Sequence, residues 1–337
     1  MTAGIGIETS CDETSIGIVK NGTEILSLKV FSQIELHAEY NGIVPEIASR
    51  AHLEKINFLL EESMAEAGIG FDQIDYIATT AWPGLTGSLM IGAQLARTMG
   101  MVLKKPVIAI DHLEAHLTAV RLENKFPEFP VLGVLLSGGN SSIFTIKDFG
   151  QMEKIADTKD DAIGEAFDKV ASILGLGYPG GPVVEKKAAM YIPKKKEKPL
   201  FPEILKEDKG ISFSFSGIKT AVLYYIRKNT LTEEKIHEIC YHFQNSVFNL
   251  VERNIVKAAR QTGINKIICA GGVMANETLA KRLKLLSAKE NLELYYPEKK
   301  ILCMDNGAMV ASLGYYYHKM KKNSGLSFRV SPVRRNS

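Results

Sequence analysis

The sequence predicts a two-lobed α/β protein, and three observations point to this fold class. The chain has 337 residues, which is long for a single hydrophobic core, since one domain usually takes roughly 100–200 residues. A pattern of strand, polar turn, strand, hairpin and strand occurs twice, beginning near residues 5 and 131. A proline-containing linker at 126–130 separates the two copies. An internal repeat of this kind indicates two copies of one structural unit.

The repeat also predicts how the chain is divided. We expect a first lobe at 1–130, joined by a C-terminal helix at 308–337 that returns to it, and a second lobe at 131–307. The polar first turns of the two copies are expected to face each other across a cleft. Such a cleft is a typical place for a nucleotide.

The first copy begins with three apolar, β-branched runs that predict consecutive strands: 5–8, 15–19 and 24–30. Asn21-Gly22 between the last two is a strong signal for a two-residue hairpin. The connection at 9–14 carries hydroxyls and the two carboxylates Asp12 and Glu13. It is either an ordinary solvated turn or a phosphate-facing turn that places these carboxylates near a metal or a reacting amine.

Helices and strands alternate through the rest of the first lobe. Pro45 and Gly68 delimit a predicted helix, because proline favours the first helical position and glycine the position after the last. His52 lies on this helix and is expected at the surface. The following segments predict a strand, a Gly-rich turn, a helix and a second strand: 75–79, 82–88, 89–103 and 107–110.

A pair of histidines follows the strand at 107–110. Asp111 is the expected N-cap of a helix that carries His112 and His116. Side chains four residues apart project from one face of a helix, and the helix dipole near the N-terminus disfavours a protonated imidazole. A neutral imidazole can bind a metal ion. The pair is therefore either two ordinary histidines or two ligands of one metal.

The second copy repeats the strand pattern and continues into Gly-rich turns. Its predicted strands lie at 131–136, 142–147 and 152–156, and its predicted helices at 161–174, 216–228 and 232–261. Asp168 is either a surface carboxylate or an acceptor for ribose hydroxyls. The turn at 175–182 has too many glycines for a packed element and suits close approach of backbone to a ligand. Gly271-Gly272 between the strand 266–270 and a helix starting near Asn276 resembles a phosphate-binding junction.

Asp305 lies at the start of the last predicted helix. It is either the N-cap of that helix or a third metal ligand, which would approach His112 and His116 from the second lobe. Two imidazoles and one carboxylate suit a divalent transition metal with open coordination positions.

Composition excludes several classes of protein. Hydrophobic residues make up 45% and charged residues 23% of the chain, as in ordinary soluble proteins. The net charge of +3 is too small to argue for nucleic acid by itself. No signal peptide and no apolar run of membrane-spanning length is evident, so we expect a cytoplasmic protein with no membrane partner. The four cysteines are scattered and are expected to be reduced.

Nine motifs, in order along nearly the whole chain, resemble the bacterial type of tRNA adenosine threonylcarbamoyltransferase, the TsaD family, formerly described as O-sialoglycoprotein endopeptidases. They occupy residues 5–14, 42–52, 83–85, 112–116, 137–139, 164–169, 180–182, 270–276 and 305–308. One departure stands out: the usual Ser-Gly-Gly-His-Thr of the family reads Ser-Gly-Gly-Asn-Ser at 137–141. Asparagine still donates hydrogen bonds, so the departure concerns a side-chain detail.

The resemblance implies an actin/Hsp70/sugar-kinase (ASKHA) fold. It also implies transfer of threonylcarbamoyl from threonylcarbamoyl-AMP to the exocyclic amine of the adenosine 3′ of the anticodon, in tRNAs reading codons that begin with A. By position, His112, His116 and Asp305 match the metal ligands. The metal is iron by resemblance, with zinc or magnesium as alternatives. The implied partners are tRNA, an inactive paralogue of the same fold (TsaB) and a small ATPase (TsaE).

The resemblance further implies contacts with the adenylate substrate. The matching positions are Leu135, Leu136, Ser137, Gly138, Gly139, Asp168, Gly181 and Asn276. Glu185 falls where many relatives place an Asp that also touches the adenylate. We interpret Asp12 or Glu13 as the base that removes a proton from the attacking amine.

Three other functions remain as alternatives. A metalloprotease would need a base in the H-E-x-x-H arrangement, but Glu114 lies off the helix face that the two histidines share. A non-catalytic ATP-binding scaffold of the Hsp70 type fits the fold equally well and would not depend on a metal. A sugar kinase is a weaker alternative, because no sugar-binding carboxylate is evident.

Overall fold

The protein consists of two units, each with its own sheet. The computed structural model describes residues 2–334 with the exception of 41, 196, 207 and 209. Unit 1 comprises Met1–Glu128, Asp148–Met152 and Pro297–Ser337, and unit 2 comprises Phe129–Lys147 and Glu153–Tyr296. The division differs from the expected boundary at 307, because residues 297–307, Asp305 among them, pack with the N-terminal part.

Unit 1 is built on a five-stranded sheet in the order β3-β2-β1-β4-β5. Its strands are β1 (Ala3–Glu8), β2 (Glu13–Lys20), β3 (Glu24–Ser32), β4 (Tyr76–Trp82) and β5 (Val107–Asp111). The first three are antiparallel, whereas β4 and β5 run parallel to β1. Asn21 and Gly22 have positive φ angles of 53° and 79°, as expected for a hairpin turn, but Lys20 pairs with Glu24, so the connection has the three residues 21–23 and not the expected two. The predicted meander and its hairpin are therefore present.

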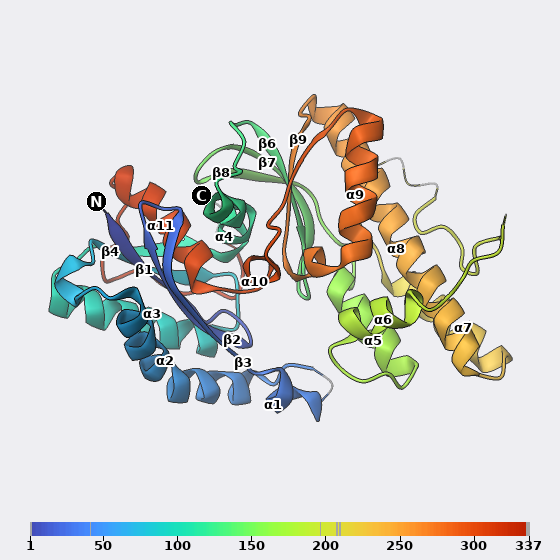
Figure 1. Ribbon diagram of the computed structural model, residues 1–337, viewed down its shortest axis with the longest axis horizontal. Helices are drawn as coiled ribbons and strands as arrows, with labels where there is room; N and C mark the ends of the chain where they lie inside the picture. Colours follow the sequence, from blue (N-terminus) through green and yellow to red (C-terminus); the bar gives the residue numbers. More distant parts are fainter. Residues whose placement is uncertain (1, 41, 196, 207, 209, 335–337) are drawn as a thin grey trace. The chain divides into compact units, whose positions relative to one another are not determined.

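Helices cover both faces of this sheet (Figure 1). Those of unit 1 are α1 (Ile34–Ala38), α2 (Pro45–Ala67), α3 (Thr86–Leu103), α4 (His112–Thr118), α10 (Lys300–Cys303) and α11 (Gly307–Lys319), with 3₁₀ helices η1 (Phe71–Gln73) and η2 (Ala119–Glu123). Ile5 and Ile7 of β1 pack into one apolar core with residues of α2 and α3. Because side chains alternate along a strand, Gly4 and Gly6 face the other side, where α11 packs.

Glycines let α11 lie directly on β1 and β2. A methyl group at Gly6 or Gly17 would overlap backbone atoms of Gly307 or Ala308. Gly307 N also donates to Ser15 Oγ at 2.9 Å, and Ser15 pairs with Glu8 in the sheet. The start of α11 is therefore fixed beside the carboxyl end of β1, which places Asp305 next to Glu8.

Unit 2 repeats the topology of unit 1. Its sheet has the order β10-β9-β6-β7-β8, the equivalent of β5-β4-β1-β2-β3. The strands are β6 (Val131–Leu136), β7 (Ser141–Asp148), β8 (Gln151–Ala156), β9 (Lys266–Ala270) and β10 (Glu293–Tyr295). The helices are α5 (Ile163–Ile173), α6 (Gly180–Ala188), α7 (Ser216–Lys228), α8 (Glu233–Thr262) and α9 (Glu277–Glu290), with η3 (Gly272–Ala275). The predicted fold class, a duplicated α/β unit, is confirmed.

Some predicted elements differ from the observed ones. The helix after Asp111 ends at Thr118 and continues as a 3₁₀ helix, and α6 begins inside the Gly-rich segment that we interpreted as a turn. The last helix is capped by Asn306, whose Oδ1 accepts from Met309 N at 2.9 Å, and not by Asp305. Among the described residues, no helix combines the length and apolar character needed to cross a membrane.

Candidate functional site

The two histidines of α4 are positioned by the strand before them. β5 ends at Asp111, whose carboxylate accepts hydrogen bonds from Leu113 N and Glu114 N and so caps α4 as predicted. His112 and His116 then lie one helical turn apart, with ring centroids 4.6 Å apart and ring planes at 84°. Both imidazoles are buried.

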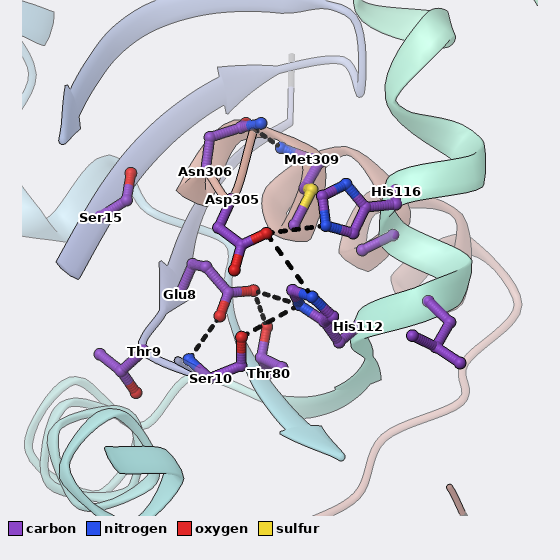
Figure 2. A network of polar contacts seen from close by, with 12 residues as sticks. Glu8, Thr9, Ser10, Ser15, Thr80, His112, His116, Asp305, Asn306 and Met309 are labelled. Carbon is purple, nitrogen blue, oxygen red and sulfur yellow. Dashed lines mark hydrogen bonds and ion pairs between the residues drawn. The ribbon is translucent and has the colours of Figure 1, made fainter. Parts of the chain in front are cut away.

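Asp305 completes a group of three donors within unit 1. Its Oδ1 lies 2.8 Å from His116 Nε2 and 3.6 Å from His112 Nε2 (Figure 2). Residues from two distant parts of the chain, α4 and the segment before α11, therefore converge on one point. Two imidazole nitrogens and a carboxylate oxygen are a donor set that suits iron or zinc, whereas magnesium prefers oxygen ligands alone.

Glu8, at the end of β1, orients the imidazole of His112 by contacting Nδ1, while Nε2 faces Asp305. Its Oε2 lies 3.0 Å from His112 Nδ1 and accepts from Thr80 Oγ1 at 2.6 Å, while Oε1 accepts from Ser10 N at 2.6 Å (Figure 2). A carboxylate that holds Nδ1–H of a histidine leaves Nε2 free for a metal. Our sequence reasoning missed Glu8, although a carboxylate that ends a buried apolar strand was a usable signal.

The electrostatics of this group fit a bound cation. Burial disfavours the charged form of His112, but the charges of Asp305 and Glu8 outweigh burial and raise its pKa to about 9. Burial alone would raise the pKa of Asp305, whereas His112 and His116 lower it to about 2. His116 Nδ1 is buried without a hydrogen-bond partner among the described residues. The donor set and its buried negative charge fit a divalent metal.

Asp12 and Glu13 are placed by the turn between β1 and β2. Both are buried, with exposures of 9% and 7%. Burial, followed by the charges of Asp305 and Asp12, raises the pKa of Glu13 well above its usual value. Burial and the charge of Asp305 also raise the pKa of Asp12, in part offset by hydrogen bonding to Glu13. The electrostatic influence of Asp305 on both carboxyls links the turn to the three donors.

His52 is buried, so the expectation of a surface histidine was wrong. Its Nε2 lies 3.0 Å from the carbonyl oxygen of Cys11, and its Nδ1 lies 2.7 Å from Thr14 Oγ1. A carbonyl only accepts, so Nε2 carries the proton and Nδ1 accepts from Thr14. The ring thus fastens both sides of the segment that carries Asp12 and Glu13.

Glu114 does not face the histidine pair. Its Oε1 accepts from Gly150 N at 2.7 Å and its Oε2 accepts from Tyr317 OH at 2.7 Å. Both oxygens are thus committed to structural contacts. This arrangement argues against the base of an H-E-x-x-H metalloprotease.

In unit 2, hydrogen bonds close the turn between β6 and β7, and the space next to its two glycines is open. Ser137 N donates to Asn140 O at 2.8 Å, and Asn140 N donates to Ser137 Oγ at 3.1 Å. A methyl group at Gly138 or Gly139 would meet no atom within 4 Å. The preceding residues, Leu135 and Leu136, are buried at the end of β6.

The other residues predicted to contact substrate adjoin this turn through a ring of contacts. Gly164 of α5 packs against Gly138, and Asp168 of the same helix accepts from Gly180 N at 2.7 Å. The helix that begins there, α6, carries Gly181 and Glu185, and Glu185 Oε1 accepts from Thr278 N at 3.2 Å in α9.

Asn276 and Gly271 close the ring. Asn276 caps α9 by accepting from Leu279 N at 2.9 Å, and a methyl group at Gly271 (φ 94°) would overlap the carbonyl of Leu136. The predicted substrate residues therefore share one rim of unit 2. Asp168, Glu185 and Asn276 each use a side-chain oxygen within the protein, which the sequence did not reveal.

Similar solved structures define the class of protein. HypF from T. kodakarensis superimposes with a TM-score of 0.62 at 16% identity, covering 95% of this chain and 48% of that one. At this identity the likeness shows the fold alone. Two units with one repeated strand order place the chain in the two-lobed actin/Hsp70/sugar-kinase class.

Sequence comparison gives the family. The family described as TsaD, tRNA N6-adenosine threonylcarbamoyltransferase, matches residues 24–312. The protein of that name from Leptospira interrogans (serovar copenhageni) is 56% identical over 334 residues, 98% of each chain. Its counterpart from Geobacter sp. (strain M21) is 41% identical over 330 residues, covering 98% of this chain and 95% of its own. The chain belongs to the TsaD family of transferases, as its sequence motifs predicted.

Proposed function

We propose that this protein transfers the threonylcarbamoyl group of threonylcarbamoyl-AMP to the exocyclic amine of the adenosine 3′ of the anticodon, in tRNAs reading codons that begin with A. The observation that carries the proposal is family membership over residues 24–312, together with a 56% identical relative that bears this name. The group of His112, His116 and Asp305, whose donor atoms lie within 4.8 Å of one another, supports metal dependence.

The three donors would hold one divalent ion, for which iron is our first expectation and zinc the second. When bound, such an ion supplies positive charge that attracts phosphate oxygens of the adenylate. Glu8 keeps His112 in the tautomer that presents Nε2. His112 and His116 are buried and the Asp305 side chain is 17% exposed, so little water reaches the three donors.

The transfer needs an acceptor for one proton. The amine nitrogen attacks the carbonyl carbon of the threonylcarbamoyl group, the bond from that carbon to the phosphate oxygen breaks, and AMP leaves with the electron pair. The attacking amine loses a proton, which we assign to the carboxylate of Asp12 or Glu13. Burial raises the pKa of both carboxyls, so whichever of the two is ionised is a stronger base than an exposed carboxylate.

Unit 2 is proposed to bind the adenylate through the rim described above. The turn at 137–139 offers backbone N–H groups, and its two glycines leave space for a ligand to approach. Asp168, Gly181, Glu185 and Asn276 are assigned to the same substrate, with Leu135 and Leu136 as the strand end that supports the turn.

Partners and location follow from the same proposal. By family resemblance, we infer assembly with a TsaB-like paralogue and a TsaE-like ATPase. We place the reaction in the cytoplasm, where tRNA substrates are found.

The deciding experiment incubates the purified protein with threonylcarbamoyl-AMP and unmodified tRNA, alone and with the two proposed partner proteins. We expect the modified nucleoside to appear by mass spectrometry of digested tRNA. A tRNA in which the adenosine 3′ of the anticodon is replaced should remain unmodified. Absence of product under every condition, with folded protein and intact adenylate, would refute the proposal.

Single substitutions test the roles within unit 1. Asp12→Asn and Glu13→Gln remove one carboxylate each, and we expect the substitution at the base to lower the transfer rate about 100-fold or more while adenylate still binds. A wild-type transfer rate in both variants would refute the assignment of the base. His116→Ala should abolish transfer together with metal binding at the site in unit 1.

A further inference from the structure

A second group of potential metal ligands lies in unit 2 and contains none of the residues assigned to the transfer reaction. Glu238 and His242 are four residues apart on α8 and therefore share one helix face. Glu197 comes from the segment between α6 and α7. One donor atom from each residue lies within 4.8 Å of the other two. The inference does not depend on the proposed transferase activity.

His242 is the buried member of this group. The residue is 7% exposed, and its Nε2 points to Glu197 Oε2 at 3.9 Å, too far for a hydrogen bond. Within the described part of the chain, no hydrogen bond to its imidazole is found. The rings of Tyr191 and Tyr241 surround it, with centroids 5.9 and 5.3 Å away. The imidazole therefore directs a nitrogen that makes no hydrogen bond at a carboxylate of the same group.

Each of the two carboxylates also has a partner outside the group. Tyr191 OH donates to Glu197 Oε1 at 2.6 Å, and Lys194 N donates to Oε2 at 3.2 Å. Lys235 Nζ pairs with Glu238 Oε2 at 2.6 Å. Lys235 therefore balances one of the two negative charges, and a cation between the carboxylates would balance the other.

We propose that Glu197, Glu238 and His242 bind a divalent transition-metal ion such as zinc, which fastens the segment after α6 to α8. Zinc bonds to histidine nitrogen and carboxylate oxygen are about 2.0–2.2 Å long, and three protein ligands plus water are a common set. The glutamate side chains are 20% and 18% exposed, so their rotation can close the 4.8 Å spread. Burial lowers the pKa of His242, which keeps the imidazole in the ligand form.

Zinc stoichiometry tests the proposal. Full-length protein is dialysed against zinc, and bound metal is counted by mass spectrometry. We expect Glu197→Gln and His242→Ala each to lose one equivalent that the wild type binds. His237→Ala is the matched control, because it removes an imidazole five residues away on the same helix, and it should retain that equivalent.

The site is separable from that of unit 1. His116→Ala is expected to lose a different equivalent, and the double variant His116→Ala/His242→Ala two. If Glu197→Gln and His242→Ala both bind as much zinc as wild type, the site in unit 2 does not exist, whatever happens at His116. Loss of the equivalent in His237→Ala instead would place the ion elsewhere on α8 and also overturn the proposal.

Two further readouts distinguish a metal site from a purely structural cluster. Lys235→Met removes the competing ammonium group, so zinc should bind this variant more tightly. Zinc should also slow trypsin cleavage after Lys194 and Lys195 in wild type but not in Glu197→Gln, because the ion holds this segment against α8. Equal cleavage rates with and without zinc in wild type would contradict the fastening role.

Discussion

Glu8 orients one of the three residues of the candidate metal site. It is fully buried, and the imidazole of His112 compensates the cost of burial strongly enough to lower the pKa of the carboxyl. Hydrogen bonds from Ser10 N and Thr80 Oγ1 hold its carboxylate against Nδ1 of His112. The residue therefore acts through His112 and is a positioning residue.

Glu8→Gln is the corresponding test. The amide has nearly the same shape but no charge, so it holds His112 Nδ1–H less strongly. We expect metal affinity to fall about 10–100-fold, the usual effect of removing such an outer partner. Competition with a chelator measures the change, and Glu24→Gln, at the exposed start of β3, is the control. Unchanged affinity in Glu8→Gln would show that Glu8 does not orient the ligand.

His52 gives a prediction about the turn that carries Asp12 and Glu13. His52→Ala removes the contacts to Cys11 O and Thr14 Oγ1, so the free energy of unfolding should fall by about 1–3 kcal/mol. The transfer rate should fall as well, while bound metal stays constant. His52→Gln can still donate to Cys11 O and should lose less. A wild-type transfer rate in folded His52→Ala would contradict a positioning role.

The cysteines allow a test of burial. Burial raises the pKa of Cys240 and Cys269 to about 12 and that of Cys303 to about 11. Burial and the charge of Asp12 raise the pKa of Cys11 as well. Thiolates are the reactive form, so the native protein should resist iodoacetamide at pH 8, whereas the unfolded chain should take up four groups. Rapid labelling of native protein, seen by intact mass, would show that these regions open.

At the scale of elements, α11 is the part on which unit 1 depends. It packs against β1, β2 and β4 and also against α4. Close approach is possible because Gly6 and Gly17 present no side chain to it. Because Asp305 lies just before α11, the packing of this helix on the sheet brings Asp305 to the two histidines. The donor set is therefore complete only when α11 is in place.

Gly17→Ala should therefore destabilise the protein. The added methyl group meets backbone atoms of Gly307 and Ala308, which cannot move aside as a side chain would. We expect a loss of about 1–3 kcal/mol or more, as for other overpacked sites, together with weaker metal binding. Gly217→Ala, where the methyl group enters open space on α7, should change stability by less than about 1 kcal/mol. Similar melting temperatures for both variants would contradict this account.

Elements with strong local signals were predictable from the sequence. Pro45 and Gly68 delimit α2 as expected, and Thr232 and Asn276 cap their helices. The helix α6 was missed because its first two residues are glycines, which locally favour a turn and are stabilised here by contact with Asp168. The change from α to 3₁₀ geometry after Thr118, whose Oγ1 donates to the carbonyls of Glu114 and Ala115, was not predicted either.

At the scale of the whole molecule, the sequence predicted which three residues form the donor set. It did not predict which unit Asp305 belongs to. The types and spacing of His112 and His116, with Asp305 far downstream, favoured a metal group. Only the structure shows that Asp305 belongs to unit 1, because long-range packing of α11 decides it. The contribution of Glu8 and the burial of His52 depend on the same kind of non-local contact.

A chain that ends at Tyr296 provides a test at this scale. It lacks Asp305 and α11, and it loses the apolar cluster that Leu302, Ala308 and Ala311 form with Val19. We expect it to bind no iron at His112 and His116 and to expose apolar surface, measured by metal analysis and by dye binding. Wild-type iron affinity in this truncated chain would show that Asp305 is dispensable.

The split of unit 1 around unit 2 has a consequence for synthesis in the cell. The five strands of the first sheet leave the ribosome early, but their last helix emerges only after residues 129–296 have been made, which takes about 10–30 s at ordinary elongation rates. During that interval the nascent chain carries an uncovered sheet face and two histidines without their carboxylate partner. An ion that needs all three donors could therefore be held only after Asp305 has been made, so its binding would follow the synthesis of residues 129–296.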